Sequence, residues 1–267
     1  MKQARRTLRR IALIGFGALG QVIAGELQAG HLPGVEFLGA LVTGTVPHPG
    51  LRSSWSRLED LLAAGPDLVV EVAGQTALES HAPGCLQAGC DVVAASVGAL
   101  MDASLRARLW DCARQGESRL LIPSGALGGL DYLRAARRLG PVHVNYRGCK
   151  PVAAWRGTAA ESMIDLSTIS KSTVFFRGGA EEAAARFPQN ANVVAALALA
   201  VGDPSAVTVE LVADPGARTN RHELTAQGVA GTIRLSVENS PLPTNPKSSR
   251  VTAFSILDAV ASHWGEP

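Results

Sequence analysis

Three glycines near the N-terminus stand at a spacing that suits phosphate binding. In the segment IALIGFGALG an apolar run leads into Gly15, Gly17 and Gly20, which fit the pattern GxGxxG. The first glycine of such a strand-to-helix turn allows the tight turn, the second lets backbone approach a pyrophosphate, and the third lets helix and strand pack closely. The N–H groups at the start of the following helix, from Ala18 onward, then face the phosphates. The sequence therefore predicts the dinucleotide-binding unit of a nicotinamide or flavin enzyme.

The segments after this turn alternate between strand and helix patterns. Ser56 and Glu59 suit a capping box that opens a short helix in this region. Such alternation predicts a Rossmann-type, doubly wound parallel sheet with right-handed crossovers over residues 1–122. The predicted strands are 35–42, 68–73, 91–95 and 120–122, and the predicted helices are 18–29, 76–88 and 103–115.

A second domain is expected at residues 123–240, because glycines break the chain and the alternation becomes less regular. Segments 222–228 and 232–238 flank a short turn, which predicts an antiparallel hairpin. The domain is therefore expected to be an α+β substrate and dimerisation domain. Residues 241–267 form the last part of the chain, and the apolar spacing within 247–263 predicts a helix that returns to the first domain.

Composition excludes several classes of function. The net charge is +2, and much of the basic excess lies in the first ten residues, so nucleic-acid binding is not expected. That basic start and the apolar run after it could form a secretory signal, but the dense glycines and the amphipathic continuation through Glu26 and Gln28 favour a folded helix. We expect no membrane span, and we expect a cytoplasmic location. The four cysteines lack a CxxC pair and the six histidines lack an HxxxH pair, which predicts reduced thiols and no metal site.

Five separated motifs in the second half of the chain, taken with the glycine turn, resemble the L-aspartate dehydrogenase family over nearly the whole sequence. The resemblance implies oxidation of L-aspartate with NAD or NADP to iminoaspartate, which hydrolyses to oxaloacetate and ammonia or feeds NAD biosynthesis. It also implies a homodimer. The motifs are PSGALGG (123–129), GCKPVAAWRGT (148–158), FPQNANV (187–193), NRHELTAQGVAG (220–231) and NPKSS (245–249).

The resemblance also assigns roles to particular residues. It places the catalytic histidine at His222 and cofactor contacts at Ala126 and Asn192. The amine of an amino acid must lose a proton before hydride can leave the α-carbon, and an imidazole with a pKa near 6.5 can accept that proton at neutral pH. The alternatives are that His222 is a structural histidine in a strand, that Ala126 is ordinary loop backbone, and that Asn192 caps a helix.

Aspartate carries two carboxylates, so its site should contain fixed cations and hydroxyl donors. Lys150 and Lys247 are the first candidates, because each lies in a segment flanked by glycine or proline, although both could be surface lysines. Thr158 and Ser248 are the expected hydroxyl donors, and Arg156 is a further cation.

The loop after Val42 leaves the choice of cofactor open. Many NAD enzymes carry an acidic residue there to bind the ribose 2′-OH. Here the candidates are Thr43, Gly44 and Thr45, which neither repel a 2′-phosphate nor bind it through an arginine.

Two alternative functions also fit the sequence. A homoserine or semialdehyde-type dehydrogenase would share the two-domain plan, and a semialdehyde enzyme would need a reactive thiolate, for which Cys149 and Cys90 are the candidates. A nicotinamide-nucleotide-sensing regulator without catalysis would retain the glycine turn and would not need His222.

Overall fold

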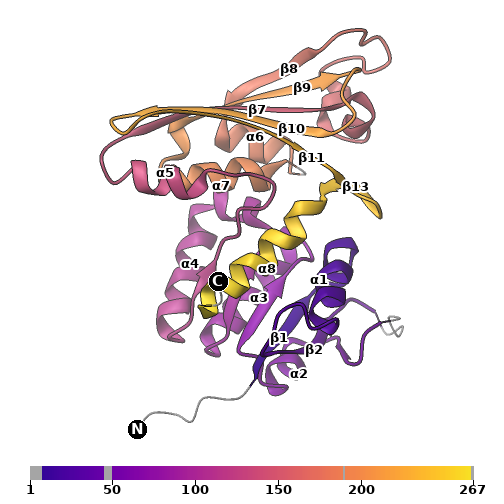
Figure 1. The fold of residues 1–267 in the computed structure, drawn as a ribbon, viewed down its shortest axis with the longest axis vertical. Helices are drawn as coiled ribbons and strands as arrows, with labels where there is room; N and C mark the ends of the chain where they lie inside the picture. The colour runs from indigo at the N-terminus through magenta and orange to yellow at the C-terminus, as the bar shows by residue number, and fades with distance from the viewer. Residues whose placement is uncertain (1–7, 45–49, 189, 266–267) are drawn as a thin grey trace. The chain divides into compact units, whose positions relative to one another are not determined.

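The computed structural model describes residues 8–44, 50–188 and 190–265, and it describes only the backbone at positions 246 and 247. The chain divides into two compact units (Figure 1). The first comprises Met1–Pro123 and Ala253–Pro267, and the second comprises Ser124–Thr252.

The first unit is built on a parallel sheet. Its strands are β1 (Arg9–Ile14), β2 (Val35–Leu41), β3 (Ser54–Trp55), β4 (Leu68–Glu71), β5 (Asp91–Ala94) and β6 (Leu120–Leu121). They lie in the order β3-β2-β1-β4-β5-β6, and neighbouring strands run parallel. The order changes direction between β1 and β4, which is where doubly wound sheets bind ligands beyond the carboxyl ends of their strands.

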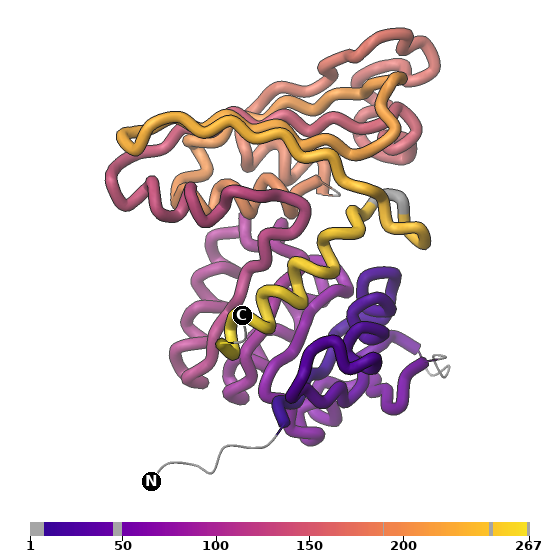
Figure 2. Tube along the Cα trace, viewed as in Figure 1, coloured from indigo at the N-terminus to yellow at the C-terminus, as the bar shows by residue number. Residues whose placement is uncertain are grey.

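The helices of the first unit complete its hydrophobic core. They are α1 (Ala18–Gln28), α2 (Leu58–Ala63), α3 (Gln75–Gln87), α4 (Ala103–Gln115), the 3₁₀ helix η1 (Val97–Met101) and, from Ala253 onward, α8 (Arg250–Trp264). Ile256 and Val260 of α8 belong to the same buried cluster as Ile11 of β1 and Val70 of β4. Figure 2 shows α8, in yellow, against the indigo and purple segments of the first unit. At the end of α8, His263 Nε2 lies 2.6 Å from Asp91 Oδ2 at the start of β5. The C-terminal helix therefore returns to the first unit, as the sequence predicted.

The second unit contains a mixed sheet in the order β11-β10-β7-β9-β8. The strands are β7 (Val142–Pro151), β8 (Thr173–Gly179), β9 (Val207–Asp214), β10 (Asn220–Gly228) and β11 (Gly231–Asn239), with a separate pair β12 (Pro241–Leu242) and β13 (Asn245–Ser249). The helices are α5 (Leu130–Ala136), α6 (Ala180–Arg186) and α7 (Ala191–Val201), with 3₁₀ turns η2 (Val152–Trp155), η3 (Ala159–Ser162) and η4 (Pro204–Ala206). Strands β7 and β9 are parallel, whereas β10 and β8 pair antiparallel with their neighbours.

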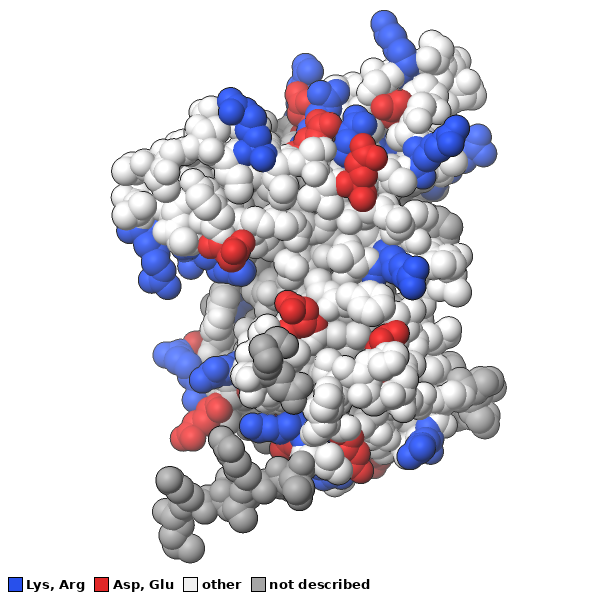
Figure 3. Space-filling view, in the orientation of Figure 1, with Lys and Arg blue, Asp and Glu red and all other residues white. Residues whose placement is uncertain are grey.

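Burial alternates along the strands of this sheet, so its two faces differ. Helices α6 and α7 pack on the face that carries the buried residues of β7, β8 and β9 (Figure 1). The other face carries polar and charged residues, and Lys, Arg, Asp and Glu side chains are interspersed over this unit in the space-filling view (Figure 3). In β10 the alternation buries His222 on the helix-covered face and leaves Arg221 and Glu223 on the other.

The predicted fold class and the predicted hairpin are confirmed, whereas two local predictions were wrong. The N-cap of α2 is Arg57, and no side chain caps this helix, so Ser56 and Glu59 do not form a capping box. The C-terminal helix begins at Arg250 and not at Lys247, because residues 245–249 pair as strand β13 with β12. The apolar spacing within a segment does not indicate that part of it pairs as a strand with another segment.

Candidate active site

The glycine turn after β1 has the geometry of a phosphate-binding turn. Gly15 has φ +97°, and a Cβ there would lie 2.7 Å from the Cβ of Ala73. A Cβ on Gly20 would lie 2.6 Å from the carbonyl oxygen of Gly15, so these two glycines are required for packing. Gly17 is the N-cap of α1, and a Cβ there would meet nothing within 4 Å. The open space at Gly17, just before Ala18 begins the helix, fits the approach of a pyrophosphate to the free N–H groups.

A buried carboxylate supports this turn. Glu71, at the end of β4, is completely buried, and its Oε1 accepts hydrogen bonds from the N–H groups of Ala73 and Gly74, each at 2.8 Å. Ser96, after β5, donates its N–H to Oε2 at 3.0 Å and its hydroxyl to Oε1 at 2.9 Å. Burial raises the pKa of Glu71, and these hydrogen bonds oppose the rise. Sequence reasoning missed Glu71, although an acidic residue at the end of an apolar strand was the available signal.

The second cluster surrounds His222, on the helix-covered face of β10. The residue is 5% exposed and pairs with Gly148 of β7 and Val237 of β11. Its Nδ1 lies 2.7 Å from the hydroxyl of Tyr146, which is also buried. Burial, and then the charge of Lys150, lower the pKa of His222 to about 4. The imidazole is therefore neutral at neutral pH and available as a proton acceptor.

Lys150 is a buried cation near this imidazole. It is 9% exposed, its Nζ donates a hydrogen bond to Oδ1 of Asn190, and Nζ lies 5.2 Å from the centroid of the Trp155 ring. Trp155 is itself fully buried and donates its Nε1–H to the carbonyl of Val212 at 3.0 Å. A buried ammonium is costly unless it is paired, and the amide and the ring face offset that cost in part. Sequence reasoning missed Tyr146, Trp155 and Asn190.

Strand β7 explains how these groups come together. Tyr146, Gly148 and Lys150 are alternate residues and so share one face of the strand. Gly148 lies directly opposite His222, and a Cβ there would lie 2.8 Å from the Tyr146 hydroxyl. The glycine of the GCK motif therefore leaves the space through which the phenol reaches the imidazole.

Comparisons with known proteins agree with both units. Residues 15–123 match the model of the homoserine dehydrogenase NAD-binding domain, and residues 131–263 match that of the aspartate dehydrogenase C-terminal domain. L-aspartate dehydrogenase 2 of Bordetella pertussis is 43% identical over 258 residues, covering 95% of this chain and 96% of the relative. The chain belongs to the L-aspartate dehydrogenase family. L-aspartate dehydrogenase of Ruegeria pomeroyi is 42% identical and covers 94% of this chain and 91% of its own length.

Solved structures of the family and of related enzymes share the fold. Aspartate dehydrogenase from Thermotoga maritima superposes with a TM-score of 0.77 at 25% identity, covering 97% of this chain and 98% of that one. A hyperthermophilic archaeal homoserine dehydrogenase in complex with NADPH has a TM-score of 0.61 at 13% identity, with the same coverage, which shows a common fold alone. The first unit has the doubly wound fold and matches an NAD-binding domain model.

The residues expected to bind the cofactor lie in several places. The carbonyl of Ala126 accepts a hydrogen bond from Asn239 Nδ2 at 2.8 Å, which fixes the backbone of the PSGA segment. Asn192 is the second residue of α7 and is exposed, and the N-cap of that helix is Asn190, whose side chain does not cap. The structure therefore does not support a capping role for Asn192. Thr43 and Gly44 are exposed after β2, and Thr45 lies outside the described residues.

Two other predicted substrate contacts, Thr158 and Ser248, form hydrogen bonds within their own segments. The hydroxyl of Thr158 donates to the carbonyl of Trp155 at 2.6 Å and accepts from the N–H of Ala160 at 3.2 Å, so it caps η3. Ser248 lies on β13, where its hydroxyl accepts from Nδ2 of Asn245 at 3.3 Å. The side chain of Lys247 lies outside the described residues. Of the predicted cations, the structure places Lys150 beside the histidine.

The cysteines do not support the thiolate alternative. All four are free and buried. Burial raises the pKa of Cys90 to about 11, and burial also raises the pKa of Cys149. A nucleophilic cysteine needs a lowered pKa, so neither thiol is activated.

Among the described residues, no group of three His, Cys, Asp or Glu side chains could hold a metal ion, and no helix is long and apolar enough to cross a membrane.

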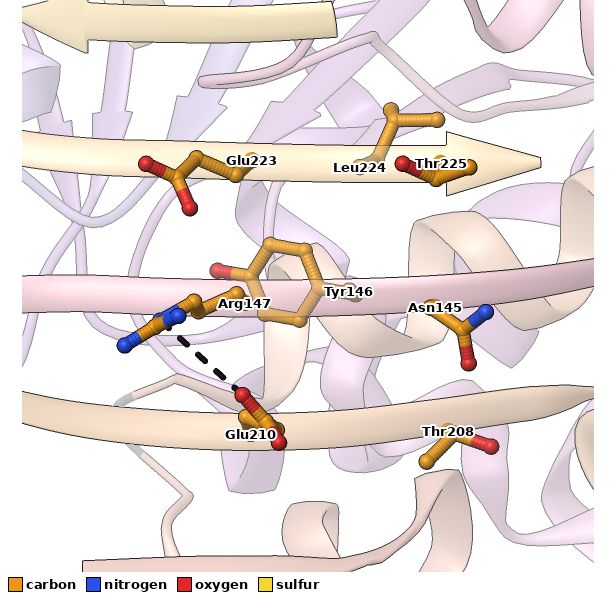
Figure 4. Close-up of a pocket in the computed structure, with 8 residues that line it drawn as sticks. All are labelled: Asn145, Tyr146, Arg147, Thr208, Glu210, Glu223, Leu224 and Thr225. Atoms are coloured by element: carbon orange, nitrogen blue, oxygen red, sulfur yellow. Dashed lines mark ion pairs between the residues drawn. The ribbon is translucent and has the colours of Figure 1, made fainter. Parts of the chain in front are cut away.

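The opposite face of the same sheet carries a shallow hollow of about 300 Å³ with a different chemistry. In Figure 4 the side chains of Arg147 and Glu210 point toward one another, with Nε and Oε2 3.9 Å apart. Arg177 of β8 also donates to Glu210, at 2.8 Å. This face is an ion-pair surface, and neither His222 nor Lys150 lines the hollow. The hollow is lined by Asn145, Tyr146, Arg147, Thr208, Glu210, Glu223, Leu224 and Thr225.

Proposed function

We propose that this chain oxidises L-aspartate with NAD or NADP to iminoaspartate, which hydrolyses to oxaloacetate and ammonia, and that the reaction is reversible. The observation that carries the proposal is the buried, neutral imidazole of His222 beside the buried ammonium of Lys150. The relatives named L-aspartate dehydrogenase support the choice of substrate.

His222 is the proposed acid and base. In the oxidative direction the N–H bond of the substrate ammonium breaks, the proton moves to the imidazole, and the electron pair stays on the amine nitrogen. A bound substrate with two carboxylates would raise the pKa of His222 from about 4 toward neutrality, since opposite charge favours the imidazolium. The base would therefore strengthen when the substrate is in place.

Lys150 is the proposed partner of one substrate carboxylate. Its ammonium is already held in a fixed position by Asn190 and Trp155, so little side-chain entropy is lost when an anion binds. Ser248 and Lys247 on β13 are candidates for the second carboxylate. Thr158 ranks below them, because its hydroxyl already both donates and accepts within its own turn.

The residues of the first unit fit a nicotinamide dinucleotide. Gly15, Gly17, Ala18 and Gly20 would hold the pyrophosphate, and Ala126 and Asn192 remain the proposed contacts in the second unit. When bound, the cofactor accepts hydride from the α-carbon. The exposed Thr43 and Gly44 carry no acidic group, so we propose that either NAD or NADP binds.

A homodimer remains part of the proposal. The face of the second sheet that bears the ion pairs carries both signs of charge, in pairs such as Arg147 with Glu210 and Arg221 with Glu223. A mixed-charge face can be complementary to itself across a twofold axis. Sedimentation of the protein at several concentrations would test this, and a concentration-independent monomer would exclude it.

A cytoplasmic location stays an expectation from the sequence.

The activity test mixes the protein with L-aspartate and each cofactor and follows absorbance of the reduced nicotinamide. The His222→Ala variant should lose about 10²- to 10⁴-fold in turnover while cofactor affinity is retained, because proton transfer by a positioned side chain contributes that much. His143→Ala, an exposed histidine on β7, is the matched control. Silence of the native protein with both cofactors would contradict the substrate, and cofactor binding without turnover would favour a sensor. Full activity of His222→Ala would contradict the base.

A further inference from the structure

The hydrogen bond between Tyr146 and His222 is the best-defined contact of the imidazole. It joins residues 76 positions apart, and both side chains are at least 95% buried. The two rings are nearly parallel, with an interplanar angle of 20° and centroids 6.0 Å apart. The chain contains two tyrosines, and the other one, Tyr132, is exposed. The proposed proton transfer uses His222 and does not involve Tyr146.

We propose that Tyr146 is a positioning residue, whose hydroxyl occupies Nδ1 of His222 and thereby makes Nε2 the nitrogen that exchanges a proton with the substrate. A neutral imidazole has one donor nitrogen and one acceptor nitrogen, so the partner of one nitrogen fixes the use of the other. The inference rests on the proposed function, because it takes His222 to be the base.

The phenol can stay with the imidazole in both protonation states. Burial raises the pKa of Tyr146 well above its usual range, so the hydroxyl remains protonated. Its oxygen can accept a hydrogen bond from Nδ1–H while Nε2 holds the free electron pair. After Nε2 takes the proton, the same bond becomes charge-assisted and therefore stronger. Tyr146 thus orients the ring without adding the negative charge that a carboxylate partner would bring.

Removal of the hydroxyl tests this role. Tyr146→Phe should lower kcat by about 10- to 100-fold and leave KM for aspartate nearly unchanged, since loss of orientation of a catalytic group has effects of that size. Loss of the charge-assisted bond should also lower the pKa of His222, so the acidic limb of the kcat/KM profile should move to lower pH. The titratable groups that face the ring in the described sheet are Tyr146 and Lys150 of β7, and the residue opposite on β11 is Val237. Tyr132→Phe is the matched control.

A second variant disturbs the contact while both partners remain. In Gly148→Ala the new Cβ would lie 2.8 Å from the Tyr146 hydroxyl and must displace it. This variant should reproduce part of the Tyr146→Phe defect. In a Tyr146→Phe background the displaced oxygen is absent, so Gly148→Ala should have a smaller further effect. The Gly148→Ala variant also serves if Tyr146→Phe fails to fold.

The double variant Tyr146→Phe with His222→Ala separates a positioning role from an independent one. If Tyr146 acts only through the imidazole, the double variant should be no slower than His222→Ala, because residues that act as a unit are not additive. A double variant far below His222→Ala would overturn the proposal. Folded Tyr146→Phe enzyme with native kcat and an unmoved acidic limb would also overturn it. A fully active His222→Ala enzyme would instead refute the proposed base.

Discussion

The glycine turn of the first unit and the His222 cluster of the second unit present their chemistry in opposite ways. The turn offers backbone N–H groups and open space at Gly17, and its key residues fall within one short segment. The cluster offers side chains, an imidazole, a phenol and an ammonium, which strands β7 and β10 bring together by their register. The glycine turn binds through backbone groups that its glycines leave accessible, whereas the His222 cluster acts through buried polar side chains.

This difference predicts different responses to substitution. At the turn, binding and stability can be separated, because open space at one glycine and crowding at another have different consequences. In the His222 cluster they cannot be separated so easily, since a buried polar group contributes to the free energy of unfolding as well as to chemistry. The contrast can be tested at His222, at Lys150 and at Gly17, in order of decreasing expected effect.

The largest effect should appear in the pH dependence of stability. The folded protein keeps His222 neutral down to about pH 4, whereas the unfolded chain binds a proton near pH 6.5. The unfolded state therefore binds more protons between these values, so the free energy of unfolding rises with pH across that window. At about 1.4 kcal/mol per pKa unit, His222 should cost about 2 kcal/mol of stability at pH 5 relative to pH 7.5, and about 3 kcal/mol near pH 4.

Urea unfolding of the cofactor-free protein at several pH values measures this effect. Carboxylates also titrate in the window, so the comparison is with His222→Gln, which keeps a hydrogen-bonding side chain but cannot titrate. The difference in the free energy of unfolding between the two proteins should grow in favour of the variant as pH falls. Parallel curves would mean that the imidazole is not buried in its neutral form.

The same contrast explains how much of the molecule could be predicted from the sequence. The turn, the parallel sheet and the β10–β11 hairpin follow from local patterns, because glycine spacing and apolar periodicity record backbone structure directly. The partners of His222 do not follow from such patterns. Tyr146 reaches it only because Gly148 lies opposite it in the β7–β10 register, and no pattern within one strand records the register of two. Asn190 was missed for a related reason, since its side chain binds Lys150 instead of capping α7.

A smaller effect is expected when Lys150 is replaced by Met, which keeps the stem and removes the charge. KM for aspartate should rise by about 10- to 100-fold, since a hydrogen bond to a charged group contributes about 1.5 to 3 kcal/mol. The charge of Lys150 lowers the pKa of His222, so the acidic limb of the kcat/KM profile should move to higher pH. Lys171→Met, at an exposed position, is the control. An unchanged KM and an unmoved limb would remove Lys150 from the substrate site.

The smallest effect, and the clearest separation of binding from stability, is expected for Gly17→Ala in the glycine turn. Gly17→Ala adds a methyl group where the protein has open space, so the free energy of unfolding should change by less than about 1 kcal/mol. The methyl group would occupy the approach of the pyrophosphate, and affinity for NAD and NADP should fall by at least about tenfold, or about 1.4 kcal/mol. Gly15→Ala should instead destabilise the fold itself by about 1 to 3 kcal/mol or more, because φ there is +97° and Ala73 is in contact. Calorimetric titration and urea unfolding of both variants measure the two quantities. If Gly17→Ala bound either cofactor with native affinity, the dinucleotide would not approach the backbone at that position, and the contrast between a backbone site and a side-chain site would fail in the first unit.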